Sequence, residues 1–349
     1  MIVAAALAAL ALSPMPAHLI AFAPNTKFPD KGASVTQTFG PFEASVPFDE
    51  AIVSWNVEHP EGAVLKVEAR AIQDGVPTKW YTMADWSYDT SLHPRESING
   101  QKDDHGTVDT DTLRLKEPAQ QIELNVTMQN DGTGEAPSLK YLSVCFSDTQ
   151  DPKADEPKAS DAWGKTLDVP ERAQNNYPNG GVLCSATSVS MMLWHYANVL
   201  NRPELNQDVP VVESMVWDSV FKGAGNWPFN TAYAGSFPGM RAYVARFAAI
   251  SDLEKWIAAG LPVVCSVSFD LLRGKPLSPE ESGHLIVLVG FTKDGDPVVN
   301  DPAFKDSVRK SYPRADFEKA WLYSHRTVYL IYPADANVPT PSDGLWAGK

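Results

Sequence analysis

A stretch with no regular periodicity divides this chain into two parts that need separate cores. The stretch, SDTQDPKADEPKASDAWGK over residues 147–165, is polar, charged and interrupted by proline, and it lacks both the helical and the strand repeat. Segments of this kind are typical of interdomain linkers. A chain of 349 residues is also long enough for two domains. We therefore predict domains at residues 35–146 and 166–335, joined by a linker at residues 147–165.

Residues 35–146 show the alternation of half-buried β-strands. The segments AIVSWNV, AVLKVEARAI, DTLRLK, QIELNVTMQ and LKYLSVCF alternate apolar and polar residues, and clusters of Gly, Pro, Asp and Asn separate them. A period of two places the apolar side chains on one face of each strand. Short strands at this spacing, with no helical segment between them, predict an all-β sandwich domain.

Residues 166–335 combine helical and strand patterns. The segment SATSVSMMLWHYANVL has its large apolar residues at helical spacing, with Ser185 and Thr187 as helix-start residues. The segment SDLEKWIAAG predicts a short helix with Ser251 as its N-cap and Gly260 at its end. Apolar runs of strand length follow in LPVVCSVSF, HLIVLVGF, PVVND and TVYLIY. Helices followed by strands predict an α+β fold.

The two ends of the chain lie outside these domains. The apolar run from Ile2 to Leu12 is too short to cross a bilayer but has the length of a signal-peptide core. We therefore predict a leader over residues 1–34, a tail over residues 336–349 and a secreted or extracytoplasmic protein. The leader is atypical, because no Lys or Arg precedes Lys27. No other stretch is long and apolar enough for a membrane span.

The composition excludes some partners. A formal net charge of −14 argues against nucleic acid, because phosphate binding needs clustered Lys and Arg. The three cysteines form no CxxC or Cys/His metal spacing, so we expect neither a metal nor a cofactor. The acidic segment QKDDHGTVDTDT, residues 101–112, could hold Ca²⁺, but a solvated acidic loop is the commoner role. The sequence does not indicate an oligomeric state.

Four residues of the second domain have the types and the order that cysteine catalysis needs. Cys184 begins the predicted helix, where the helix dipole favours a thiolate. His284 could hold the proton as imidazolium, and Asp301 could orient His284. Gln174 and the Cys184 backbone N–H could donate hydrogen bonds to the oxyanion that forms on an attacked carbonyl. Each residue type also has common structural roles, so the residues alone leave both interpretations open.

The spacing of His284 and Asp301 does not by itself predict a contact. A strict two-residue turn at Asp294–Gly295 pairs Asp301 with Leu288, about 13 Å along the strand from His284. A bulge, a longer turn or strong twist must close part of this offset. Asn300 is the alternative orienting residue.

Other candidates are weaker. His195 lies eleven residues beyond Cys184 in the same predicted helix, about 16 Å along its axis, which is too far for a base. Cys145 and Cys265 lie within apolar runs and are expected to be inert core thiols.

The second domain resembles the family-39-like cysteine peptidases, secreted bacterial proteins of the papain-like superfamily. The resemblance rests on YPNGGVLCSATSVSMMLWHY, GMRAYVARF, LEKWIAAGLPVVCSVSF, SGHLIVLVGFTKDGDPVVNDPAF and VRKSYPRADFEKAW, which cover most of residues 170–332. The family pattern carries over to Gln174, Cys184, His284 and Asp301. Family members often have proline soon after the cysteine, whereas Ser185-Ala186 follows it here. This difference makes the helix start less rigid and removes no catalytic group.

The resemblance implies a papain-like α+β domain behind a β-sandwich, with the active site between helices and sheet. The implied function is a thiol-dependent hydrolase that cleaves peptide or amide bonds through an acyl-enzyme on Cys184. Its partner would be a peptide or protein substrate, and cell-wall peptides would suit an exported enzyme. The alternative is a catalytically inactive peptidase-like protein that serves as a cell-surface or glycan- or peptide-binding module. Trp55, Trp80 and Trp86 could then form a sugar-stacking surface, although core packing is the commoner role of tryptophan.

Overall fold

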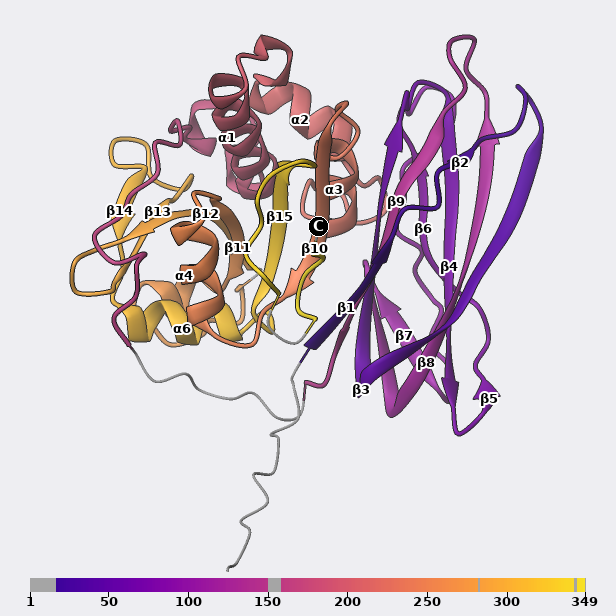
Figure 1. Cartoon of the computed structure of the whole chain (residues 1–349), viewed down its shortest axis with the longest axis horizontal. Coiled ribbons are helices and arrows are strands. Elements are labelled where there is room, and N and C mark those ends of the chain that lie inside the picture. The colour runs from indigo at the N-terminus through magenta and orange to yellow at the C-terminus, as the bar shows by residue number, and fades with distance from the viewer. Residues whose placement is uncertain (1–16, 150–157, 282, 342–343, 349) are drawn as a thin grey trace, which may run out of the picture.

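The first domain consists of strands alone. The structure is a computed structural model that describes residues 17–149, 158–281, 283–341 and 344–348 (Figure 1). Its first nine strands are β1 (Ala17–Phe22), β2 (Thr26–Lys27), β3 (Ser34–Glu58), β4 (Ala63–Gln73), β5 (Val76–Pro77), β6 (Tyr81–Ser87), β7 (Gly106–Asp109), β8 (Thr112–Asn130) and β9 (Ser138–Ser147). They form one antiparallel sheet with the main order β1-β9-β3-β8-β4-β5. Strands β2, β6 and β7 pair with β9, β4 and β8.

This sheet closes over its own core. The long strand β3 pairs with β8 along its first part and with β9 along its last part, so it belongs to both layers. Trp55 on β3 and Trp86 on β6 are separated by β8 and β4, a spacing of about 14 Å in a flat sheet. Their ring centroids nevertheless lie 6.2 Å apart. The predicted all-β sandwich is confirmed, with its two layers continuous through the long strands.

The tryptophans of this domain serve mainly in packing. Trp55 and Trp86 are almost fully buried, and the Trp55 ring also meets Phe229 of the second domain at 6.3 Å. Trp80 is partly buried, with the Arg70 guanidinium 4.5 Å from its ring centroid. A sugar-stacking surface that includes Trp55 and Trp86 is therefore excluded, and the core interpretation is correct for these two.

Part of the segment predicted as a leader is a component of the sheet. β1 pairs with β9 from Ala17↔Ser147 to Phe22↔Leu142, and β2 pairs with the other end of β9. From Ala17 onward these residues therefore belong to the first domain, because their backbone groups complete its edge. Residues 1–16, which hold the apolar run, lie outside the described residues.

In the second domain, helices precede the first strand and further helices lie between the strands of a six-stranded antiparallel sheet of order β10-β15-β11-β12-β13-β14, which confirms the α+β prediction. Among the described residues, no helix has the length and hydropathy needed to cross a bilayer. The helix α4 (Ile250–Ala258) starts two residues earlier than predicted, with Ala249 rather than Ser251 at the N-cap. The elements are η1 (Gln174–Asn176), η2 (Gly180–Val182), α1 (Cys184–Val199), η3 (Pro203–Leu205), α2 (Val209–Val216), α3 (Trp227–Ala234), β10 (Met240–Arg246), α4 (Ile250–Ala258), β11 (Val263–Val267), α5 (Phe269–Leu272), β12 (His284–Phe291), β13 (Pro297–Asn300), β14 (Arg309–Ser311), α6 (Arg314–Leu322) and β15 (Thr327–Pro333).

The segment predicted as a tail is packed onto both domains. The Trp346 side chain is 2% exposed, and its ring lies 5.1 Å from Phe247 and 5.9 Å from Trp256. Two residues earlier, the Gly344 carbonyl accepts a 2.7 Å hydrogen bond from the Leu19 N–H of β1. This segment therefore ties the outer strand of the first domain to the second domain.

The domains also meet along β10. Asn56 of β3 donates through Nδ2 to the Ala242 carbonyl (2.7 Å) and accepts through Oδ1 from the Ala242 N–H (3.1 Å). Ser54 accepts a 3.0 Å hydrogen bond from the Val244 N–H. The contact is tight, since a Cβ at Gly235 would come within 2.1 Å of the Asn56 side chain. Side chains of one domain thus bind the backbone of a strand in the other.

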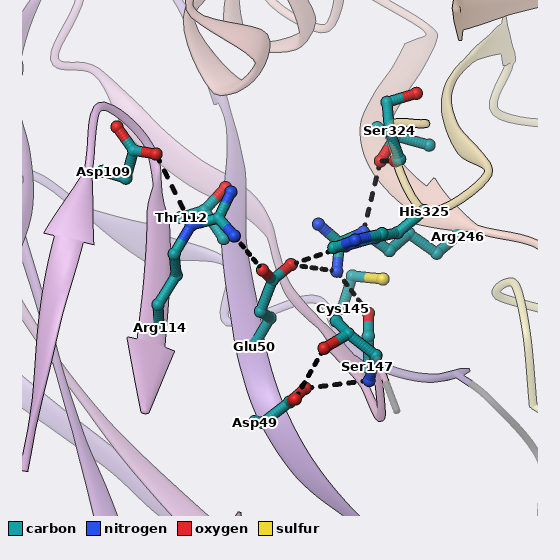
Figure 2. Close-up of polar contacts among 12 residues, drawn as sticks. Asp49, Glu50, Asp109, Thr112, Arg114, Cys145, Ser147, Arg246, Ser324 and His325 are labelled. Atoms are coloured by element: carbon teal, nitrogen blue, oxygen red, sulfur yellow. Dashed lines mark hydrogen bonds and ion pairs between the residues drawn. The ribbon is translucent and has the colours of Figure 1, made fainter. Parts of the chain in front are cut away.

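A buried cluster of charges adds to this interface (Figure 2). Glu50 of β3 has a side chain only 4% exposed, and its Oε2 lies 2.6 Å from Arg246 Nη1 of β10 and 3.1 Å from His325 Nδ1. Arg114 of β8 reaches the other carboxylate oxygen from the protein surface. Burial alone would raise the pKa of Glu50, but His325 and the two arginines lower it to about 2. Glu50 is therefore an anion that holds cations of both domains.

Candidate active site

The fold places Cys184 at the start of α1, and this helix packs against β12 of the second sheet. Leu183 occupies the N-cap without a side-chain cap, so a capping side chain does not compete for the first-turn N–H groups. Ser185 and Thr187 lie inside the helix rather than at its cap. The Ser188 hydroxyl donates to the Leu285 carbonyl of β12 (3.1 Å), which holds the helix on the sheet. The half-buried Cys184 thiol therefore lies beside the start of β12.

His284 is the first residue of β12, and Asp301 directly follows β13. The structure pairs Phe291 with Pro297 and Val287 with Asn300, with a register shift between Leu288 and Gly290. The longer turn and this irregularity together move Asp301 two positions closer to His284 than a strict two-residue turn would. His284 Nε2 then donates to Asp301 Oδ1 over 2.7 Å. Two of the three means named for closing the offset, a longer turn and a bulge, thus bring the two side chains together.

Asp301 is the carboxylate that meets His284, and Asn300 points elsewhere. The Asn300 amide donates to the Val169 and Pro170 carbonyls and accepts from Arg309 Nε. It therefore holds the segment that enters the second domain. None of these hydrogen bonds of the Asn300 side chain reaches His284, so they do not support the alternative that Asn300 orients His284.

His284 also links to Cys184. A side-chain hydrogen bond joins the thiol to the imidazole, and the backbone N–H groups of Ser185 and Leu285 also favour the thiolate. Because Nε2 is taken by Asp301, Nδ1 is the ring nitrogen that remains for the thiol. Cys184, His284 and Asp301 thus form one continuous line of contacts, in which His284 and Asp301 are buried.

The three groups shift one another's pKa. Burial alone would raise the pKa of the Cys184 thiol, but the hydrogen bond and charge of His284 hold it below its ordinary value. Burial alone would lower the pKa of His284, but its hydrogen bonds to Asp301 and Cys184 raise it to about 10. Burial also opposes the charge of Asp301, yet the donors around the carboxylate lower its pKa. These directions favour a thiolate beside an imidazolium at neutral pH.

Gln174 lies next to this line of contacts. Its N–H donates to the Pro302 carbonyl (2.9 Å), directly after Asp301, and the turn through Gly180 joins it to the start of α1. A Cβ at Gly180 would lie 2.5 Å from the Gln174 carbonyl oxygen, so this approach requires glycine. The Gln174 side chain is buried, and within the described parts of the chain its Oε1 has no hydrogen-bond partner. The amide is therefore not committed to another residue through that atom.

The competing residues are structural, as expected. Burial raises the pKa of the Cys145 thiol to about 11 and raises that of Cys265 further. His195 is mostly buried, and its Nδ1 lies 3.0 Å from the Asp168 carbonyl. In the part of the chain that the structure describes, neither Cys145 nor Cys265 has a histidine partner of the kind that lowers the pKa of Cys184, and His195 contacts a backbone carbonyl.

Two carboxylates of the acidic segment at residues 101–112 accept hydrogen bonds, Asp103 within the first domain and Asp111 from the Trp227 N–H of the second domain (2.7 Å). Asp103 accepts hydrogen bonds from Tyr81 Oη (2.6 Å) and from the N–H groups of His105 and Gly106. Across residues 17–149, 158–281, 283–341 and 344–348, no group of three or more His, Cys, Asp or Glu side chains is placed to hold a metal ion.

Two residues at the site were not identified from the sequence. The Tyr312 hydroxyl donates to Asp301 Oδ2 over 2.6 Å, and the Phe269 ring lies 4.7 Å from the His284 ring. Tyr312 lies in the quoted segment VRKSYPRADFEKAW, but a tyrosine has no spacing rule that ties it to a distant aspartate. Only the three-dimensional pairing of β13 with β14 brings it there.

The comparisons with known proteins assign both domains. Residues 30–147 match the family model of the Peptidase C39 N-terminal domain, and residues 166–329 match that of the Peptidase C39-like family. An all-β domain followed by this α+β domain defines a two-domain protein with a peptidase fold. The chain belongs to the family-39-like peptidases.

Solved structures and curated proteins add little to this assignment. A Bacillus anthracis protein described as a C39-like peptidase is 19% identical, with a TM-score of 0.36, over 48% of this chain and 96% of its own. The serine protease of Aeromonas sobria is 10% identical, with a TM-score of 0.23, over 39% of this chain and 27% of its own. The infectious bursal disease virus VP2 subviral particle is 14% identical, with a TM-score of 0.22, over 41% and 38%. Comparison with curated proteins gave no match.

Proposed function

We propose that this protein is a thiol-dependent hydrolase that cleaves a peptide or amide bond through an acyl-enzyme on Cys184. The observation that carries the proposal is the continuous line of contacts from the Cys184 thiol through His284 to Asp301. Three side chains from α1, β12 and the end of β13 meet there, and their pKa shifts all favour the reactive ion pair. A buried thiol kept for packing alone would not need such partners.

The reaction would begin with attack by the Cys184 thiolate on the substrate carbonyl carbon. The resulting oxyanion would accept hydrogen bonds from the Cys184 backbone N–H and the Gln174 amide. His284 would give its proton to the leaving amine as the C–N bond breaks, which leaves a thioester on Cys184. Water would then attack the thioester carbonyl while His284 takes up its proton. The C–S bond would break and restore the thiolate. Asp301 would hold His284 in orientation through both steps.

The substrate that we propose is a peptide or protein, because both family assignments are to peptidase domains. Peptides of a cell wall are one class that an exported enzyme would meet. Export itself stays a prediction, since the residues on which it depends lie outside the described part of the chain.

The first experiment measures how fast iodoacetamide alkylates each cysteine between pH 4 and pH 9, with mass spectrometry as the readout. At pH 6 an ordinary thiol with a pKa near 8.5 is only about 0.3% ionised. Cys184 should therefore react about 100-fold faster than such a thiol. Cys145 and Cys265 are internal controls for buried, unactivated thiols in the same sample.

A second readout tests turnover. The protein is incubated with a mixture of peptides of diverse sequence, and new termini are detected by mass spectrometry against a Cys184→Ala control. Cleavage that requires Cys184 supports the proposal. A Cys184 that reacts no faster than Cys145 and Cys265 would overturn it and favour the binding-module alternative.

A further inference from the structure

The carboxylate of Asp301 has donors on both oxygens, and one of them is a tyrosine outside the catalytic line. Oδ1 accepts from His284 Nε2 (2.7 Å) and from the Ala303 N–H (3.0 Å), while Oδ2 accepts from the Tyr312 hydroxyl (2.6 Å). The Asp301 backbone is fixed as well, since its N–H donates to the Val308 carbonyl over 2.7 Å. The side chain can therefore rotate about its last bond only by breaking the bond to Tyr312 or those to His284 and Ala303.

Tyr312 is itself held in place. It directly follows β14, its N–H donates to the Pro297 carbonyl at the start of β13 (3.1 Å), and its side chain is buried. Burial and the neighbouring Asp301 charge raise the pKa of its phenol well above the ordinary value. The hydroxyl therefore keeps its proton and donates it at every pH at which the protein would work. A hydrogen bond from a neutral donor to a buried carboxylate is of the strong, charge-assisted kind.

Without that donor, Oδ2 would be a buried anionic oxygen with no partner among the described residues. Such an atom is costly, so the carboxylate would either take up a proton or turn away from His284. Either change weakens the hold on the imidazolium and so the stability of the thiolate. The other charges near this pair are Lys310, which faces Asp301 from β14, and Arg273, which faces Tyr312 from the end of α5.

We propose that Tyr312 is a positioning residue of this site, which keeps Asp301 ionised and its Oδ1 directed at His284. The inference rests on the proposed function, because it assigns Tyr312 a role in the same thiolate–imidazolium pair. Tyr312 acts through Asp301 and does not contact Cys184 or a substrate itself. Its effect is greatest at acid pH, where an unsupported carboxylate would be protonated first.

The test compares the pH profile of Cys184 alkylation in the wild type, Tyr312→Phe, Asp301→Asn and the double variant. Tyr312→Phe removes one oxygen and keeps the ring. It should move the acid limb upward by about half to one pH unit, equivalent to a three- to tenfold lower rate below the midpoint. Asp301→Asn should move the limb at least as far. Because Tyr312 acts through Asp301, adding Tyr312→Phe to Asp301→Asn should cause no further shift.

Two controls separate this role from a general loss of structure. Tyr243→Phe removes another buried hydroxyl, which contacts Tyr332 Oη (3.2 Å) and the Ala347 N–H (3.2 Å), and should leave the profile unchanged. Alkylation of the buried Cys145 and Cys265 reports unfolding in the same spectra. A variant that merely unfolds would label all three cysteines together and would not produce a shifted limb for Cys184 alone.

The outcomes distinguish the two proposals. A reactive wild-type Cys184 whose acid limb is unchanged in Tyr312→Phe would overturn the role of Tyr312 and leave the hydrolase proposal standing. An equal shift in Tyr312→Phe on the Asp301→Asn background would also overturn it, since the effect would then bypass Asp301. A wild-type Cys184 without enhanced reactivity would remove the basis of both.

Discussion

Two carboxylate–histidine pairs in this protein, each with a buried carboxylate, have similar contact distances and different surroundings. Asp301 lies 2.7 Å from His284 at the candidate active site, and Glu50 lies 3.1 Å from His325 at the domain interface. His284 is 4% exposed and its remaining ring nitrogen faces a thiol. The His325 side chain is 35% exposed, and its carboxylate partner is already occupied by Arg246 and Arg114.

The difference shows that the group next to a carboxylate–histidine pair decides the role of the pair. This group is the Cys184 thiol at the candidate active site and a pair of arginines at the domain interface. Beside a thiol, the carboxylate stabilises the imidazolium that forms when the imidazole takes the proton from sulfur. Beside two arginines, the carboxylate is saturated by permanent cations, and its histidine is an additional contact at the rim. The first arrangement favours a reactive nucleophile. The second joins two domains.

The largest effect is expected when the histidine of each pair is replaced in turn. His284→Asn removes the proton acceptor of Cys184, so its alkylation at pH 6 should fall about 100-fold, to the rate of an ordinary thiol. Any peptide cleavage should fall by about 100- to 10,000-fold. The matched His325→Asn variant retains a residue that tolerates the positive φ of 52° found there. Equal losses in both variants would contradict the division of roles.

The next effect concerns stability. Glu50→Gln leaves the 3% exposed Arg246 side chain without its buried counter-charge, so the free energy of unfolding should fall by about 3 kcal/mol or more. Urea denaturation followed by tryptophan fluorescence measures this change. Glu58→Gln is the control, because the Glu58–Lys140 pair is exposed and should contribute at most about 1 kcal/mol. A loss for Glu50→Gln no larger than for Glu58→Gln would show that the buried cluster is not a stabilising element.

The smallest effect is a pH dependence of the same cluster. The pKa of Glu50 is about 2 in the folded chain against an ordinary value of 4.5, so the folded state favours the ionised form. Its contribution to stability is complete above pH 4.5 and is lost as the pH falls toward 2. Between pH 7 and pH 3 this one group should cost about 2 kcal/mol of unfolding free energy. Denaturation curves at both pH values should show that Glu50→Gln lacks this component, and an identical pH slope in wild type and variant would refute it.

Much of the fold could be predicted from local patterns. Alternation in segments such as AVLKVEARAI and helical spacing in SATSVSMMLWHYANVL are properties of neighbouring residues, and both domain classes followed from them. The positions of Ala17 and Trp346 could not be predicted in this way. Their burial depends on β9 and on Phe247 and Trp256, which lie far away in the sequence.

The candidate site could likewise be predicted only in part. Cys184 and His284 could be predicted as candidates because each begins a regular element, and side-chain type at an element's end is visible in the sequence. The hydrogen bond between His284 and Asp301 could not be predicted from the spacing, since it depends on a register shift between Leu288 and Gly290 that no composition rule encodes. Tyr312 could not be identified either, because it reaches Asp301 only through the pairing of β14 with β13.

The contacts of Asn56 and Ser54 with β10 have a consequence for how this protein avoids aggregation. β10 is the last strand at one end of its sheet, and in the described sheet only β15 pairs with it. Open strand edges invite pairing with other chains. Here side-chain atoms of the first domain occupy the Ala242 and Val244 backbone groups that a foreign strand would use. The β-sandwich thus covers the unpaired edge of β10 and protects it from pairing with other chains. A second domain produced without the β-sandwich would expose this edge and is expected to self-associate.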